Sequence, residues 1–218
     1  MIEDKDERIK NTKTLDELFV LWKEAQGKEE NAQETFPCCP CCGNPPEFLG
    51  FKEFFYPDGY ISDKDCYNGV LIICRESNAT EDIRAEKCRQ DFFWIKENKE
   101  KTGKYWSFIN KALNELCKKS AKTDEHIKDP SFCAYVNINK RGGYRRCDLK
   151  QLSNYFDKYR LFIKKEIELL NPKYVICGGV YGTVKNILPD TVKKVMDCWH
   201  PSRGFKCKGI HDVIMNKE

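Results

Sequence analysis

The segment that decides the fold class is FIKKEIELLNPKYVICGG, residues 162–179. Its first half has apolar residues at helical spacing and stops at Asn171-Pro172, because proline disfavours a helical conformation in the residue before it. Its second half is a short apolar run, Tyr174–Cys177, that ends in two glycines. Such a run is typical of a strand buried on both faces of a parallel sheet.

The same alternation extends over most of the chain. Three further apolar runs are typical of buried strands: Val70–Cys74, Cys133–Ile138 and Val192–Met196. Helical spacing of apolar residues indicates one helix near residues 106–116 and a longer one over residues 152–170. This order predicts an α/β fold, a three-layer α/β/α sandwich around a central four-stranded parallel sheet.

Residues 1–67 differ in character and are predicted to form an N-terminal elaboration, with the α/β domain over residues 68–218. An amphipathic helix with Thr14 and Asp16 placed to cap it is indicated by an apolar stripe: Leu15, Leu18, Phe19 and Trp22. A cysteine- and proline-rich knuckle follows at residues 36–46. A hairpin is expected over residues 48–61.

Composition limits the class of protein. The 218 residues carry 38 Lys and Arg against 34 Asp and Glu, a net charge of +4 that permits a polyanionic partner without requiring one. No stretch is long and apolar enough for a membrane span, and the start, MIEDKDERIK, lacks the pattern of a secretory signal. We therefore expect a cytoplasmic protein, nucleoid-associated if prokaryotic, with no membrane partner and an undefined oligomeric state. Most of its 13 cysteines are expected to be reduced or metal-bound.

Polar residues follow each predicted strand. The segment after the first strand carries a carboxylate, Glu76, and the second strand ends in an amide, Asn137. A glycine turn at Gly178-Gly179 follows the third strand, and an imidazole, His200, follows the fourth. Carboxyl ends of parallel strands share one edge of a sheet, so these groups are expected to surround one site.

In the order and spacing of these motifs the chain resembles the uracil-DNA glycosylase superfamily, and most closely its family 4 enzymes. Those enzymes have a G-E-x-P-G-type motif, then N-V-V-K, a helix ending I-x-x-x-x-P, a glycine turn and H-P-S. The counterparts, within residues 68–205, are Cys74–Asn78, Asn137–Lys140, Ile167–Pro172 with Gly178-Gly179, and His200–Ser202. The resemblance implies a DNA glycosylase that flips uracil or another altered base out of DNA and hydrolyses its N-glycosidic bond.

The resemblance also implies individual roles. Glu76 would position water and support the cationic sugar, and His200 would donate to the departing base, so both are expected to be catalytic. Asn137 would read the base, with Ser77 and Asn78 in the same base-binding pocket.

Each of these residues also has a plain structural interpretation. Glu76 can cap the following helix or pair with Arg75. Asn139 competes with Asn137 for the base, and His200 can be an ordinary core histidine. The candidates for stacking on the base, each also explained by core packing, are Phe92, Phe93, Tyr105 and Trp106.

Residues 140–146, KRGGYRR, form the densest basic run. A run of this kind either forms a solvated loop or neutralises phosphates. The residues expected to contact DNA are Lys140, Arg141, Arg145, Arg146, Gly179, Ser202 and Arg203. Arg203 and Phe205 stand where many members of the superfamily carry an aliphatic wedge.

The cysteine pattern departs from that of family 4, whose members hold an iron–sulfur cluster. Arg141 and Tyr159 stand at two of the four ligand positions, so no such cluster is expected, nor any catalytic metal. Cys39 and Cys42, in a C-P-x-C-G knuckle, form half of a zinc site that Cys207 and His211 could complete, with Cys38, Cys41 and Cys66 as rivals. The alternative is a metal-free turn.

The competing function is a non-catalytic nucleic-acid or nucleotide-binding module that keeps a glycosylase-like fold. It would use the knuckle and the basic run for binding. A protein that binds DNA but releases no base would be this module, whereas release of a base would identify an enzyme.

Overall fold

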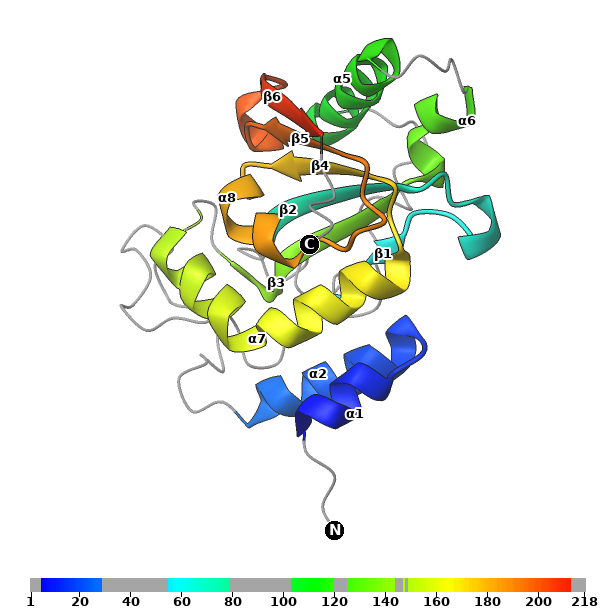
Figure 1. Cartoon of the computed structure of the whole chain (residues 1–218). Coiled ribbons are helices and arrows are strands. Elements are labelled where there is room, and N and C mark those ends of the chain that lie inside the picture. The colour runs from blue at the N-terminus through cyan, green and yellow to red at the C-terminus, as the bar shows by residue number, and fades with distance from the viewer. Residues whose placement is uncertain are drawn as a thin grey trace. The chain divides into compact units, whose positions relative to one another are not determined.

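The computed structural model describes residues 5–28, 55–78, 103–119, 125–143, 147 and 149–212, which form a mixed α/β fold (Figure 1). The helices are α1 (Lys5–Asn11), α2 (Leu15–Gly27), α5 (Lys104–Lys119), α6 (Glu125–Lys128), α7 (Leu149–Leu170) and α8 (Tyr181–Val184). The strands are β1 (Gly59–Tyr60), β2 (Val70–Asn78), β3 (Ala134–Gly143), β4 (Tyr174–Gly178), β5 (Lys194–Cys198) and β6 (Cys207–Asp212). The α/β class and the four expected strand regions are confirmed.

The sheet has six strands in the order β1-β3-β2-β4-β5-β6. Strands β2, β4 and β5 are parallel, with Val70 opposite Tyr174 and Tyr174 opposite Lys194. Strand β1 pairs antiparallel with β3, and β6 pairs antiparallel with β5. The sheet is therefore mixed and six-stranded, where the sequence predicted four parallel strands. The two added strands lie at the edges, where little burial is needed and the apolar signal is weak.

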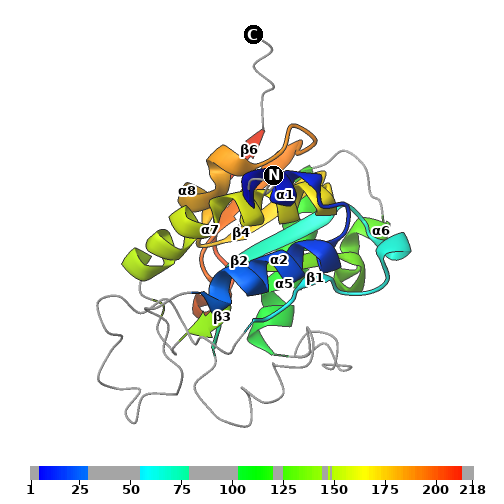
Figure 2. The same ribbon diagram turned by 90° about the horizontal axis from the view of Figure 1, so that it is seen from below.

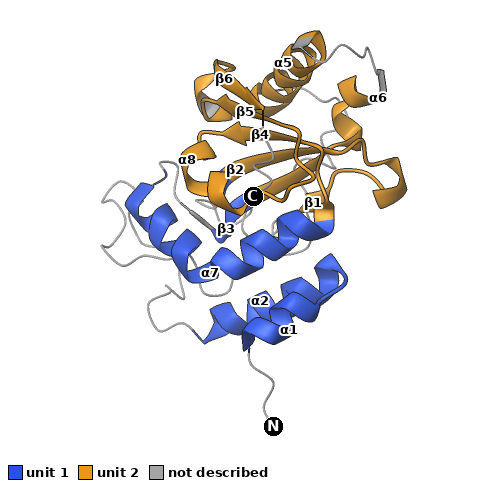
Figure 3. Ribbon diagram, viewed as in Figure 1, with its two compact units in different colours: residues 1–57, 75–91, 137–169 blue, residues 58–74, 92–136, 170–218 orange. Residues whose placement is uncertain are grey.

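The chain divides into two compact units, each built from separate segments (Figure 3). Unit 1 comprises residues 1–57, 75–91 and 137–169, and unit 2 comprises residues 58–74, 92–136 and 170–218. Strands β2 and β3 contribute residues to both units.

Unit 2 holds a core between helix α5 and the sheet. The expected apolar stripe of α5, which includes Trp106 and Leu113, is buried against Val70 and Ile72 of β2, Ile176 of β4 and Met196 of β5. A buried aliphatic side chain of this kind contributes about 1.5–3 kcal/mol. The parallel strands are thus held as one layer beneath α5.

Unit 1 packs α1 and α2 against α7; Figure 2 shows these helices from below. Trp22 of α2 is fully buried and stacks on Phe162 of α7, with ring centroids 5.2 Å apart. Thr14 caps α2 as expected, because its hydroxyl accepts a hydrogen bond of 3.2 Å from the Glu17 amide. Helix α1 was not expected; Ile9 is its single buried apolar residue.

Helix α7 ends where the sequence predicts. Asn171 takes a left-handed conformation with φ 46°, which stops the helix, and Pro172 follows. Of the expected hairpin over residues 48–61, residues 48–54 lie outside the described part. Within that part Gly59–Tyr60 pairs with β3. None of the described helices is long and apolar enough to cross a bilayer.

Candidate functional site

The carboxyl ends of β4 and β5 form one edge of unit 2. Strand β4 ends at Gly178, and the next residue, Gly179, has φ 76°, a conformation that glycine adopts without strain. The Gly179 amide donates to the Cys198 carbonyl at 2.8 Å, which ties this turn to the end of β5. That amide therefore holds the two strands together, and this use competes with the DNA contact expected of Gly179.

His200 lies two residues beyond the end of β5 at the same edge. Its side chain is half-buried, and the Tyr105 ring of α5 meets it edge-on at 90°, with centroids 6.1 Å apart. The His200 carbonyl accepts a hydrogen bond from the Arg203 amide at 2.9 Å, within the turn Pro201–Arg203. Backbone and aromatic contacts thus hold His200 just beyond the carboxyl end of β5.

The segment from Trp199 to Lys206 forms a loop closed by a 2.9 Å bond from the Trp199 amide to the Lys206 carbonyl. Lys206 Nζ lies 4.5 Å from the Trp199 ring centroid, and the Arg203 guanidinium lies 6.0 Å from it. Phe205 packs edge-on against Phe108 of the core. The loop thus places the Lys206 and Arg203 cations beside the half-buried Trp199 indole. The Phe205 ring packs against the core instead.

Glu76, Ser77 and Asn78 are the last three residues of β2 and belong to unit 1, but their side chains lie outside the described part. Asn137 of β3 is also in unit 1 and is 3% exposed. Asn139, its competitor for the base, accepts a 2.9 Å hydrogen bond from the Arg141 amide. Asn139 is thus occupied with the backbone of its own strand.

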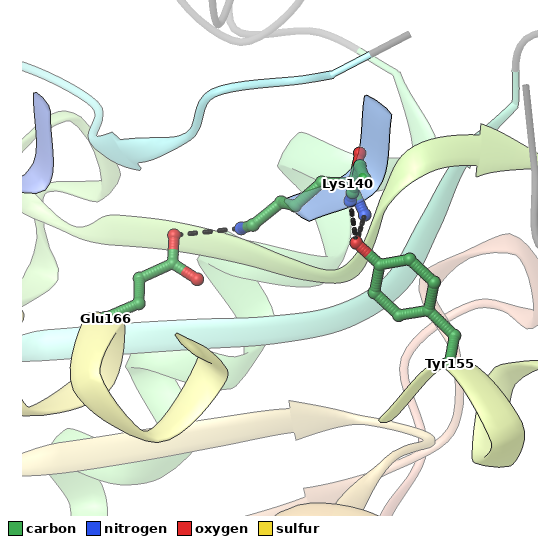
Figure 4. A network of polar contacts seen from close by, with 4 residues as sticks. Lys140, Tyr155 and Glu166 are labelled. Atoms are coloured by element: carbon green, nitrogen blue, oxygen red, sulfur yellow. Dashed lines mark hydrogen bonds and ion pairs between the residues drawn. The ribbon is translucent and has the colours of Figure 1, made fainter. Parts of the chain in front are cut away.

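The expected phosphate contacts of Lys140 and Arg141 do not fit the positions of these residues, because both side chains are fully buried. Lys140 Nζ lies 2.8 Å from Glu166 Oε1 of α7, and the Lys140 amide donates to the Tyr155 hydroxyl at 3.2 Å (Figure 4). Lys140 Nζ also lies 5.3 Å from the Trp22 ring centroid. A phosphate in solution cannot reach a cation enclosed in this way.

Arg141 is enclosed by the same unit. Its guanidinium donates to the Gln26 carbonyl at the end of α2, and the Gln26 amide donates to the Tyr155 hydroxyl. Arg145 and Arg146 lie outside the described residues, and so does the Ser202 side chain. Of the seven expected DNA-contacting residues, Arg203 is the one with a described, exposed side chain.

Cys39 and Cys42 of the expected zinc half-site lie outside the described residues. The proposed second half, Cys207 and His211, lies on β6. The His211 ring stacks on Tyr181 at 4.7 Å, and Cys207 Sγ lies 3.5 Å from the Gly209 carbonyl oxygen. Within the described part of the chain no three His, Cys, Asp or Glu side chains come together as a metal site.

Glu166, the buried partner of Lys140, was not predicted from the sequence. It lies on the apolar face of α7, four residues after Phe162 and four before Leu170, both of which are buried. A carboxylate at a core position of an amphipathic helix is costly unless it is paired, so its position was a usable signal.

The fold and the edge of unit 2 define a mixed α/β protein with a histidine and a basic loop at the carboxyl ends of parallel strands. Comparison with protein-family models, with curated proteins and with solved structures finds no match. The functional interpretation therefore depends on the residues themselves.

Proposed function

We propose that the chain is a DNA glycosylase of the uracil-DNA glycosylase type, with that superfamily's three-layer fold. The observation that supports this proposal best is the edge of unit 2. There the glycine turn after β4 and His200 after β5 emerge from adjacent parallel strands. The open α/β sheets of enzymes bind their ligands outside the carboxyl ends of the strands.

The proposed reaction hydrolyses the bond between the sugar C1′ and a base nitrogen. The electron pair of that bond leaves with the base, and water adds to C1′. An imidazole N–H of His200 would stabilise the negative charge that develops on the base, and the Glu76 carboxylate would favour the cationic sugar. The edge-on Tyr105 ring would hold the imidazole in its orientation.

The alternative is a nucleic-acid-binding module without chemistry. The loop over residues 199–206 favours it, since an indole flanked by Arg203 and Lys206 suits stacking on a base beside its phosphate. A glycosylase can use this loop equally well, so binding alone does not separate the two functions.

Paired measurements on Glu76→Gln separate them. For an enzyme, the rate of base release should fall about 10²-fold or more while DNA affinity stays nearly constant, because the carboxylate acts on the transition state. Arg203→Ala is the matched variant and should weaken DNA binding and reduce its salt dependence by about one counterion. DNA binding without base release from any substrate would favour the binding module.

A further inference from the structure

Two cysteines face each other across the β5–β6 ladder. Cys198, the last residue of β5, is the register partner of Cys207, the first residue of β6. The next pair along, Trp199 and Lys206, is joined by an amide-to-carbonyl hydrogen bond. The ladder shifts register between Asp197 and Cys198, so that Lys208 has no partner of its own on β5, and Cys198 and Cys207 are the first facing pair beyond this shift.

This position suits a disulfide. Cα atoms of residues that face each other in an antiparallel ladder are about 4.5–5.5 Å apart, inside the range of about 4.4–6.8 Å found for disulfides. The two thiols are hydrogen-bond partners. Their sulfur atoms are thus already adjacent in the reduced protein, and little backbone movement is needed to join them.

The neighbouring cysteines are poor competitors. Cys74 lies on β2, which is separated from β5 by β4. At a strand spacing of about 4.8 Å its Cα is about 9.6 Å from that of Cys198, beyond the reach of a disulfide. Cys177 precedes Gly178, the register partner of Cys198, so its side chain points to the opposite face of the sheet.

The two thiols differ in access. Cys198 is fully buried, and burial raises the pKa of its thiol well above the ordinary value. Cys207 is half-buried and reaches solvent at the edge strand. Cys207 is therefore the sulfur that an oxidant meets first, and Cys198 is the thiol placed to resolve the product.

We propose that Cys198 and Cys207 are a site of reversible oxidation, at which a peroxide converts the two thiols into a disulfide. Peroxide first oxidises the Cys207 thiol to a sulfenic acid, with release of one water. The Cys198 sulfur then attacks Cys207 Sγ, the S–O bond breaks, and the Cys198 proton leaves with the hydroxide as a second water. Two thiols and one hydrogen peroxide thus give one disulfide and two waters.

The bond would close a covalent ring around residues 199–206, the loop that contains His200 and Arg203. Oxidation would then restrict the segment that carries these residues. The inference depends on the strand register and holds whether or not the chain is a glycosylase.

The test uses the folded full-length protein, treated with hydrogen peroxide or with diamide, alkylated, and digested with trypsin. The Cys198 peptide spans residues 195–203 and the Cys207 peptide spans residues 207–208. We expect them to be recovered mainly as one linked species, lighter than the sum of the two by two hydrogen atoms and separated by reduction. Oxidation of the protein unfolded in urea should no longer favour the Cys198–Cys207 link over other disulfides.

Cys207→Ser should abolish the linked species and leave Cys198 available to alkylation after unfolding. Cys177→Ala, which removes a buried thiol from the opposite face, should retain the link. Recovery of both peptides in alkylated form after diamide, or a link from Cys198 to a different cysteine, would overturn the proposal.

Discussion

Lys140 Nζ lies 2.8 Å from Glu166 Oε1, and neither side chain has exposed surface. The two residues belong to β3 and α7 of unit 1, and the pair is enclosed further by the Phe19 and Trp22 rings, 5.8 and 5.3 Å from the nitrogen. Enclosure makes the partners interdependent, because each alone would be a buried, uncompensated charge.

Replacement of one partner should therefore be costly. Lys140→Met should lower the free energy of unfolding by about 3–5 kcal/mol, as measured by urea denaturation. Lys164→Met is the control. Lys164 lies on α7, is half-exposed, and has its Nζ 3.8 Å from Glu168 Oε1. Its replacement should lower the free energy of unfolding by less than about 1 kcal/mol. Equal effects of the two substitutions would show that Lys140 is not enclosed as described.

Trp22 is the largest fully buried side chain of unit 1. Trp22→Ala should destabilise the protein by about 3–5 kcal/mol because it opens a cavity against Phe162. Val20→Ala, at a position on the same helix that is 59% exposed, should change stability by less than about 0.5 kcal/mol. A shift in urea midpoint that is as large for Val20→Ala would contradict the packing of α2.

Gly178 has no side chain, and this leaves room for the Cys74 sulfur of β2 and for Pro201, the residue after His200. A Cβ at this position would lie 2.7 Å from Cys74 Sγ and 3.1 Å from Pro201 Cδ. Gly178→Ala should cost about 1–3 kcal/mol, and less in a Cys74→Ala background, with a coupling of at least about 0.5 kcal/mol.

The control for this cycle is Gly182→Ala, since nothing lies within 4 Å of a Cβ there. It should be neutral or stabilise by up to about 1 kcal/mol. Strict additivity of the Gly178 and Cys74 substitutions would mean that the sulfur and the glycine do not meet.

Burial raises the pKa of the Cys133 thiol from 9.0 to about 12, with Asp129 adding to the rise and the Asn68 hydrogen bond opposing it. The folded state then retains a proton that the unfolded state loses. The contribution of the Cys133 thiol to the free energy of unfolding is therefore fully present below about pH 9. It decreases by about 1.4 kcal/mol per pH unit between about pH 9 and about pH 12.

Urea denaturation at a series of alkaline pH values measures this slope. Cys133→Val keeps a buried side chain of similar size without a titrating group, so its stability should fall less steeply above pH 9. Parallel curves for the two proteins would show that the Cys133 thiol does not contribute to alkaline unfolding. Tyr135 and Cys177, whose pKa values burial also raises, should maintain a residual slope of the same sign.

The interior strands were predictable because a strand buried on both faces must be apolar throughout. The end of α7 was predictable because Asn171-Pro172 stops a helix for local reasons. The edge strands were not, since Gly59–Tyr60 is two residues long and β6 reads CKGIHD. Helix α1 was not predicted because it buries a single apolar side chain and so has no apolar stripe.

The basic run shows why the site was harder to predict than the fold. Lysines and arginines in a row are usually solvated, and the sequence near Lys140 gives no sign of burial. Its partner Glu166 is 26 residues away in the chain. His200 was easier to place, because the carboxyl end of a predicted parallel strand fixes where the next residues emerge.

Release of a free base is the most direct test of the proposed function. Duplex and single-stranded oligonucleotides, each with one uracil or other altered base, are incubated with the unmodified protein. The free base is measured by chromatography, and the abasic site by alkaline strand cleavage. We expect release from at least one substrate, about 10²-fold slower for Glu76→Gln. No release from any substrate, with salt-dependent DNA binding retained, would contradict the glycosylase function.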